Sequence, residues 1–81
     1  MSPVVLRSQG YRFAWWSNEN REPPHVHVFK GDAAAKWWLD FLEEEYSVGF
    51  NPNQRRLIRD ILEEHRLELL KEWYVSFPEA P

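Results

Sequence analysis

Two histidines separated by a single residue, His25 and His27, follow a Glu-Pro-Pro segment and are the side chains best suited to chemistry in this chain. Residues 25–30 alternate between polar and apolar side chains, which predicts a β-strand. Side chains two positions apart on a strand share a face and lie roughly 6.6 Å apart. We therefore expect both imidazoles on one face of a sheet.

Glu22 is the carboxylate that this sequence ties most closely to the histidine pair. Pro23 and Pro24 each fix their own φ, and each disfavours a helical conformation in the residue before it. Glu22 is thus held in an extended segment at a nearly constant distance from His25. The pattern predicts a site built from one carboxylate and two imidazoles.

Acid–base chemistry without a metal is the leading interpretation of this site. Imidazole titrates near neutrality, so one histidine can accept a proton while the other donates one. In RNA cleavage the ribose 2′-hydroxyl is the nucleophile, and a nearby cation would stabilise the phosphorane. We predict catalytic roles for Glu22, His25, His27 and Lys36, and substrate binding by Arg12, Arg21 and Lys30.

Two alternatives remain open for the histidine strand. A His-x-His pair can present two nitrogen ligands to Zn²⁺, and Glu22 would then be the third ligand. Alternatively, both rings are structural and only make hydrogen bonds within the sheet. We assign no metal ligand and no cofactor from the sequence, because the spacing alone is a weak signal. His65 is either a core histidine of a helix or a further member of the site.

Charge is distributed unevenly along the 81 residues, whose net charge is −3. Residues 1–40 carry five basic and four acidic side chains, a balance of +1, whereas residues 41–81 carry five and nine, a balance of −4. The overall excess of acid argues against unselective nucleic-acid binding. Any anion-binding site is therefore expected in the first half, beside the histidines.

Cysteine is absent, which excludes disulfides and thiolate metal sites. No apolar run approaches the ~18 residues that would span a bilayer, and the N-terminus lacks the apolar core of a signal peptide. We expect a cytoplasmic protein with no membrane contact.

The elements that must position the site are five short strands and one helix. Strands are expected at residues 4–7, 11–17, 25–30, 33–39 and 43–50, with tight turns at Gln9-Gly10 and Gly31-Asp32. Asn51, Pro52 and Gln54 form a helix start with a capping box. The helix is expected over about residues 52–74. The prediction is one α+β domain over residues 1–81: an antiparallel β-meander of four to five strands with one long C-terminal helix packed on one face.

A single helix covers one face of a sheet, yet aromatic residues occur on both faces of the second and fourth strands. We therefore expect the uncovered face, marked by Trp16 and Trp38, to meet a partner protein or a second copy of the chain as a homo-oligomer.

The chain also resembles a small bacterial family, domain of unknown function 4160 (DUF4160). The resemblance is carried by Gly10-Tyr11-Arg12-Phe13, by Arg21-Glu22-Pro23-Pro24-His25-Val26-His27-Val28 with Lys30-Gly31, by Ala35-Lys36-Trp37-Trp38-Leu39, by Gly49-Phe50 and by Leu69-Leu70 with Trp73. It covers nearly the whole chain, and the Glu-Pro-Pro-His-x-His block is its most specific part.

The resemblance implies a compact α+β fold encoded beside a second small protein. Such pairs are thought to act as toxin–antitoxin modules, with this family as the toxin. The motif positions correspond here to Glu22, His25, His27, Lys30 and Lys36, while His65 stands where relatives are expected to carry asparagine.

Our functional hypothesis is the toxin of a bacterial type II toxin–antitoxin module, neutralised by a small cognate antitoxin and acting on RNA as a metal-independent ribonuclease. The alternatives are a non-catalytic protein-binding module and a small metalloprotein.

Overall fold

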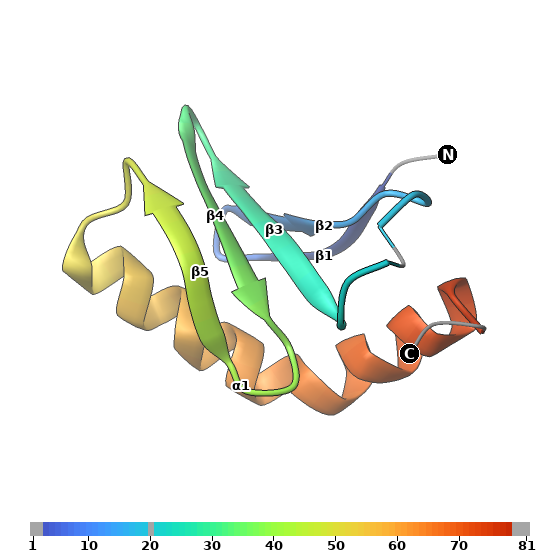
Figure 1. Cartoon of the computed structure of the whole chain (residues 1–81). Helices are drawn as coiled ribbons and strands as arrows, with labels where there is room; N and C mark the ends of the chain where they lie inside the picture. The colour runs from blue at the N-terminus through green and yellow to red at the C-terminus, as the bar shows by residue number, and fades with distance from the viewer. Residues whose placement is uncertain (1–2, 20, 79–81) are drawn as a thin grey trace.

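The computed structural model describes residues 3–19 and 21–78. Within them the chain forms β1 (Val4–Ser8), β2 (Tyr11–Ala14), β3 (His25–Lys30), β4 (Ala33–Trp38), β5 (Glu43–Val48) and α1 (Pro52–Ser76). The strands lie in the order β1-β2-β3-β4-β5, and each pairs antiparallel with its neighbour. Figure 1 shows a twisted sheet with α1 running behind it. The predicted α+β meander with one C-terminal helix is confirmed.

Two turns with left-handed backbone conformations allow β1 to pair with β2 and β3 to pair with β4, as predicted. Gln9 and Gly10 have φ values of 51° and 85° and connect β1 to β2, the combination that two-residue hairpin turns require. Gly31, with a φ of 58°, opens the turn between β3 and β4. The hairpins place residues far apart in the sequence into register, including His27 opposite Lys36.

Three strands were predicted to extend one to three residues further than they do. β2 ends at Ala14 and not at residue 17. The backbone N–H of Trp16 donates a hydrogen bond to the Glu19 side chain and not to a neighbouring strand. β5 ends at Val48 because Gly49, with a φ of 87°, turns the chain toward α1. β4 ends at Trp38, one residue before the predicted end, and β1 extends to Ser8, one residue beyond it.

The capping box predicted at the start of α1 is present. The Gln54 backbone N–H donates to the Asn51 side chain at 2.8 Å, and the Asn51 backbone N–H donates to the Gln54 side chain at 2.9 Å. Such reciprocal bonds satisfy two donors that a helix otherwise leaves free. α1 continues to Ser76, two residues beyond the predicted end.

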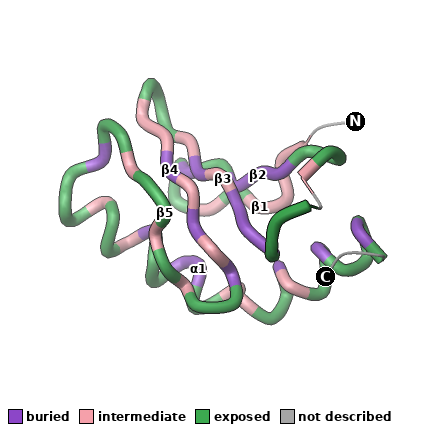
Figure 2. Tube along the Cα trace, viewed as in Figure 1, coloured by how far each residue is buried: buried purple, intermediate pink, exposed green. Residues whose placement is uncertain are grey.

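The hydrophobic core lies between α1 and one face of the sheet. Buried residues alternate with less buried ones along most of β4, whereas β3 begins with two buried residues, as the colours of Figure 2 show. The sheet contributes Phe13, Val26, Val28, Ala35 and Trp37, and the helix contributes Ile58, Ile61, Leu62, Leu69 and Trp73. No helix in the described part of the chain is long and apolar enough to cross a membrane.

Arg66 fixes α1 to the connection that follows β4. Its guanidinium donates hydrogen bonds of 2.9 Å to the backbone carbonyls of Leu39 and Asp40. These carbonyls lie outside the sheet ladder, so the arginine supplies the donors they lack.

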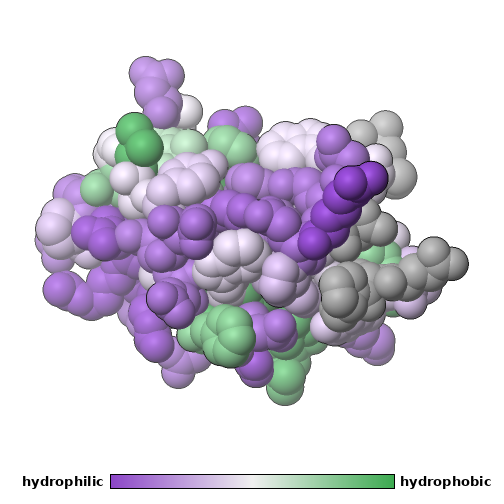
Figure 3. Space-filling view, in the orientation of Figure 1, coloured by the Kyte–Doolittle hydropathy of each residue, from purple (hydrophilic) through white to green (hydrophobic). Residues whose placement is uncertain are grey.

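The face of the sheet opposite α1 is turned toward the viewer in Figure 1. In the same orientation, Figure 3 shows this side as largely hydrophilic, with pale areas of intermediate hydropathy among the polar atoms. The uncovered face is thus mainly polar, with areas of intermediate hydropathy and a few hydrophobic groups, and is not one extended apolar surface.

Candidate functional site: a histidine–carboxylate cluster

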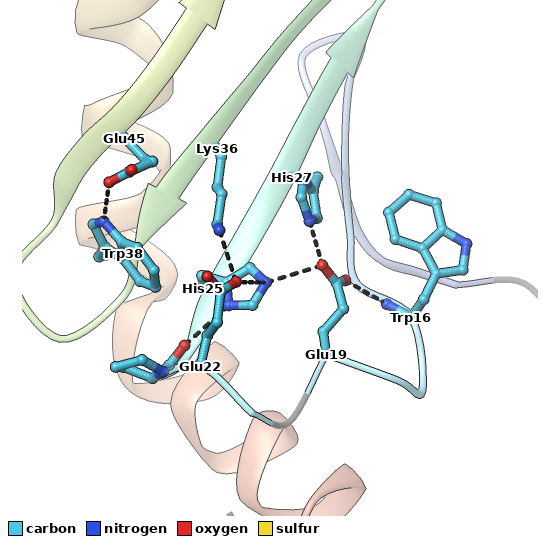
Figure 4. Close-up of polar contacts among 9 residues, drawn as sticks. Trp16, Glu19, Glu22, His25, His27, Lys36, Trp38 and Glu45 are labelled. Carbon is cyan, nitrogen blue, oxygen red and sulfur yellow. Dashed lines mark hydrogen bonds and ion pairs between the residues drawn. The ribbon is translucent and has the colours of Figure 1, made fainter. Parts of the chain in front are cut away.

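The side chains of Glu19, His25 and His27 meet at one point beside the start of β3 (Figure 4). Oε1 of Glu19 lies 3.0 Å from Nε2 of His25 and 2.5 Å from Nε2 of His27. The two imidazole rings have centroids 5.3 Å apart and are nearly perpendicular, at 86°. One carboxylate oxygen is therefore shared by the two histidines predicted to share a face.

A tight turn after β2 brings Glu19 to the histidines. The backbone N–H of Glu19 donates to the carbonyl of Trp16 at 3.2 Å, and the backbone N–H of Trp16 donates to Oε2 of Glu19 at 2.8 Å. The second oxygen of the carboxylate is thus held by the backbone of its own turn, which directs the first oxygen toward the strand. A carboxylate held at both oxygens loses little further conformational freedom when it binds a ligand.

His25 is fully buried, with no exposed side-chain surface. Its ring lies between Trp38 and Trp73, with centroid distances of 5.6 Å and 5.1 Å. Nδ1 lies 2.9 Å from the carbonyl oxygen of Pro23. A carbonyl only accepts, so Nδ1 carries a proton and the ring presents Nε2 to Glu19.

His27 is the more accessible of the two imidazoles, with 15% of its side chain exposed. Its ring is stacked at 17° on Phe29 and tilted against Trp16, with centroid distances of 6.4 Å and 5.4 Å. His27 and not His25 therefore faces any ligand that approaches the sheet.

Glu19 is an ionised carboxylate despite being mostly enclosed. Burial raises its pKa, but the contact with His25, the hydrogen bond from the Trp16 backbone N–H and the contact with His27 together outweigh burial, and the pKa is lowered. Hydrogen bonds to the charged form of a carboxylate favour that form. The cluster thus keeps a negative charge next to two imidazoles.

Glu22 lies beside this cluster and binds mainly to Lys36. Nζ of Lys36 donates to Oε1 of Glu22 at 2.7 Å, while the same oxygen lies 3.8 Å from Nε2 of His25. The hydrogen bond from Lys36 is the largest cause of a lowered pKa for Glu22. Lys36 also lies over the ring of Trp38, 4.6 Å from its centroid, and only 13% of its side chain is exposed. The four residues predicted as catalytic are therefore neighbours.

The three cations predicted to bind substrate do not gather at the site. Lys30 lies over the ring of the buried Tyr11, 4.5 Å from its centroid, on the helix side of the sheet. An odd number of positions separates Lys30 from His27 along β3, so the two side chains lie on opposite faces. Arg12 pairs with Phe29, which lies two positions beyond His27 on the same face of the sheet. Only Arg21 lines the hollow beside His27, together with Trp16 and both glutamates.

The aromatic residues predicted for the open face have different environments. Trp16 is 43% exposed and borders the hollow. Trp38 is half-buried, and its indole N–H donates to Glu45 at 2.8 Å. Glu45 is the extra residue in β5 where the register with β4 shifts. Trp16 is therefore the more available of the two for contact with a partner.

His65 is separate from the cluster. Its Nδ1 lies 2.8 Å from Oε2 of Glu68, one turn further along α1, and 27% of its side chain is exposed. The structure thus gives it neither a place in the site nor a fully buried core position.

Glu19 is the site residue that the sequence did not indicate. It lies in a polar loop six positions before His25, a separation too long for a local spacing rule to predict contact. The available signal was the loop itself, which returns the chain from β2 to β3 and so must pass beside the first residues of β3.

Comparison with known proteins gives one match. No curated protein and no solved structure matches the chain. A family model described as DUF4160, a domain of unknown function, matches residues 10–74. That span contains β2 to β5, the Glu19 turn and Trp73, so the site lies wholly within the matched region. The chain belongs to the DUF4160 family.

Proposed function

We propose that this protein is the toxin of a bacterial type II toxin–antitoxin module, held inactive by a small cognate antitoxin, and that it acts on RNA at the hollow beside His27. The toxin role is supported by the family resemblance set out above. The observation that carries the choice of RNA is that an exposed indole, an accessible imidazole and two cationic side chains lie together on one open face.

Trp16 is suited to binding a nucleobase. Its ring is nearly half exposed and stands 5.4 Å from that of His27. Stacking of a base on an aromatic side chain contributes about 1–3 kcal/mol in single-stranded RNA complexes and tolerates any base. A base on Trp16 would place the adjoining ribose and phosphate near His27.

Arg21 and Lys36 are suited to binding the phosphate. Arg21 is exposed and lines the hollow. Lys36 is paired with Glu22, whose side chain is 50% exposed and can turn into solvent when a phosphate takes its place. When a phosphate replaces Glu22, the charge of Lys36 stays compensated. The exchange therefore avoids the cost of leaving a partly buried charge unpaired.

In the metal-free protein, His27 and Glu19 form a carboxylate–imidazole pair. When Nε2–H of His27 donates to Glu19, Nδ1 becomes the basic nitrogen and accepts the proton of a ribose 2′-hydroxyl. The 2′-oxygen would then bond to phosphorus as the bond to the 5′-oxygen breaks, and the leaving 5′-oxygen would take up a proton from solvent. Lys36 would stabilise the charge that develops on the phosphorus oxygens. The expectation that His25 is the second proton-transfer group stays a prediction from the sequence, and the buried ring supports an orienting role for it instead.

Growth arrest on induction tests the toxin role. We expect the wild-type chain, induced alone, to arrest growth of a bacterial host, and co-induction of the small protein encoded beside it to restore growth. His27→Ala should abolish arrest at matched levels of folded protein. His65→Ala removes a histidine outside the site and serves as the control that keeps arrest.

RNA cleavage by purified protein tests the reaction. Cleavage products should form from single-stranded RNA and disappear with His27→Ala or Lys36→Met. If both variants arrest growth like the wild type, the toxin acts through binding and the catalytic assignment is wrong. Trp16→Glu separates that case, because a surface that works by binding would lose arrest with this variant alone.

A further inference from the structure

The cluster of Glu19, His25 and His27 brings together three atoms that can bind a metal ion. Hydrogen bonds alone do not account for their arrangement. The three ligand atoms, one carboxylate oxygen and two Nε2 nitrogens, lie within 4.8 Å of one another. All three belong to residues that other contacts hold in place: the turn at Trp16 holds the carboxylate, and the sheet and two indoles hold the imidazoles. The convergence is therefore preorganised.

The position of the ring proton on His25 determines what the cluster requires. Nδ1 donates to the carbonyl of Pro23, so a neutral His25 has its lone pair on Nε2. That lone pair points at an oxygen of Glu19, which also presents a lone pair. Two facing lone pairs need a positive charge between them, which is either a proton on a fully buried ring or a metal ion.

The hydrogen bond to Pro23 matches the usual surroundings of a metal-bound histidine. Such a histidine donates its other ring N–H to a carbonyl or carboxylate, and this fixes the tautomer and the ring orientation. Two imidazoles and one carboxylate are the ligands of mononuclear zinc sites and of 2-His-1-carboxylate iron sites that keep open coordination positions.

We propose that Glu19, His25 and His27 bind one divalent transition-metal ion of the Zn²⁺ class through Oε1 and the two Nε2 atoms. Its remaining coordination position would face the hollow lined by Trp16 and Arg21, because His27 and Glu19 are the partly exposed members of the set. Such an open position would admit water or a phosphate oxygen.

The ligand atoms would have to move by about 1–1.5 Å to hold the ion. Ligands bound at about 2.0–2.1 Å in tetrahedral geometry lie about 3.3 Å apart. The separations from Oε1 of Glu19 are 3.0 Å and 2.5 Å, so Glu19 would move outward by less than about 1 Å. The three ligand atoms lie within 4.8 Å of one another, so the two Nε2 atoms would approach each other by up to about 1.5 Å. Glu19 lies on the loop between β2 and β3, outside the strands, where it is only partly buried.

This ligand set differs from the one considered from the sequence, in which Glu22 was the third ligand. Lys36 holds Glu22, whose oxygen lies 3.8 Å from Nε2 of His25. The inference also goes beyond the proposed function, because metal binding does not require that the chain be a toxin or cleave RNA.

Metal titration of untagged, chelator-treated protein tests the proposal. Zn²⁺ is added in competition with a chromophoric chelator, and Co²⁺ is added separately to record its visible absorption. We expect one equivalent of Zn²⁺ to bind and a four- or five-coordinate Co²⁺ spectrum to appear. Glu19→Gln and His27→Gln should each weaken Zn²⁺ binding by roughly 100-fold or more, at or above the loss seen when a residue that hydrogen-bonds a metal ligand is changed.

His65→Gln is the matched control, because it removes a histidine–glutamate pair outside the cluster. It should leave affinity and stoichiometry unchanged. The proposal is overturned if the wild type binds no tighter than Glu19→Gln, or if the tight site survives His27→Gln and is lost with His65→Gln. Far-ultraviolet circular dichroism of each metal-free variant shows whether it is folded, and Glu19→Gln preserves shape, so it still decides the outcome if the histidine variant unfolds.

Discussion

Two regions of this protein place a histidine against a glutamate, and they differ in what surrounds the pair. At the start of β3, His25 and His27 share one oxygen of Glu19, and His25 is fully buried. On α1, His65 meets Glu68 at 2.8 Å with most of the carboxylate in solvent. The distances are similar, so distance does not distinguish the two regions.

Convergence and burial distinguish them. The pair on α1 joins residues three positions apart, which any helix brings together. The cluster at β3 joins a turn, a strand and, through the ring of Trp73, the far end of the helix. A polar contact assembled from distant segments and removed from water is costly unless all of its members are satisfied. We therefore expect the two regions to respond very differently to the same substitution.

The largest difference is expected from replacing one histidine in each region by alanine. His25→Ala leaves a cavity between two indoles and removes the partner of the Pro23 carbonyl, so it should lower the free energy of unfolding by about 3 kcal/mol. His65→Ala should change it by no more than about 0.5 kcal/mol. Urea unfolding followed by tryptophan fluorescence measures both. Equal losses would show that the buried cluster has no special structural role.

A double-mutant cycle sharpens the comparison at the level of a single contact. In chelator-containing buffer, Glu19→Gln combined with His27→Gln should show a coupling energy of about 1–2 kcal/mol, because the bond is charge-assisted and partly enclosed. The corresponding cycle of Glu68→Gln with His65→Gln should give about 0.3 kcal/mol. Each single variant is measured by the same urea unfolding. A coupling at Glu19 no larger than that at Glu68 would contradict the preorganised cluster.

The smallest effect is expected at the edge of the cluster, from the pair of Glu22 and Lys36. The hydrogen bond from Lys36 lowers the pKa of Glu22 below its ordinary value of 4.5. A carboxylate with a lowered folded-state pKa stabilises the fold above its ordinary pKa, and this contribution is lost as the pH falls through the folded-state value. Lys36→Met should raise the pKa of Glu22 toward 4.5, which an NMR titration of the side-chain carboxyl carbon detects. An unchanged titration curve would show that the pair does not persist in solution.

Much of the fold could be predicted because its determinants are local. The alternation over residues 25–30, the left-handed turn at Gln9 and Gly10, and the capping box at Asn51 each depend on a few adjacent residues. Strand ends were less predictable. β2 stops at Ala14 because the side chain of Glu19 competes for a backbone donor, a contact that no periodicity reveals.

The candidate site was predictable only in part, for the same reason. Period-two geometry correctly placed His25 and His27 on one face, and the register of β3 with β4 then brought Lys36 opposite His27. The same alternation places Lys30 over Tyr11 on the helix side, away from the histidines.

The sequence by itself determined the histidine pair, the strands that carry it and the helix that covers the other face, because strand alternation and helix capping act over a few residues. Only the tertiary structure decided that Glu19 and not Glu22 joins the pair, and that Trp73 encloses His25 from 48 positions away in the chain. Those contacts depend on the path of a loop and on the packing of a helix end against a sheet. Neither is encoded in a short stretch of residues, since each results from the burial of the whole core.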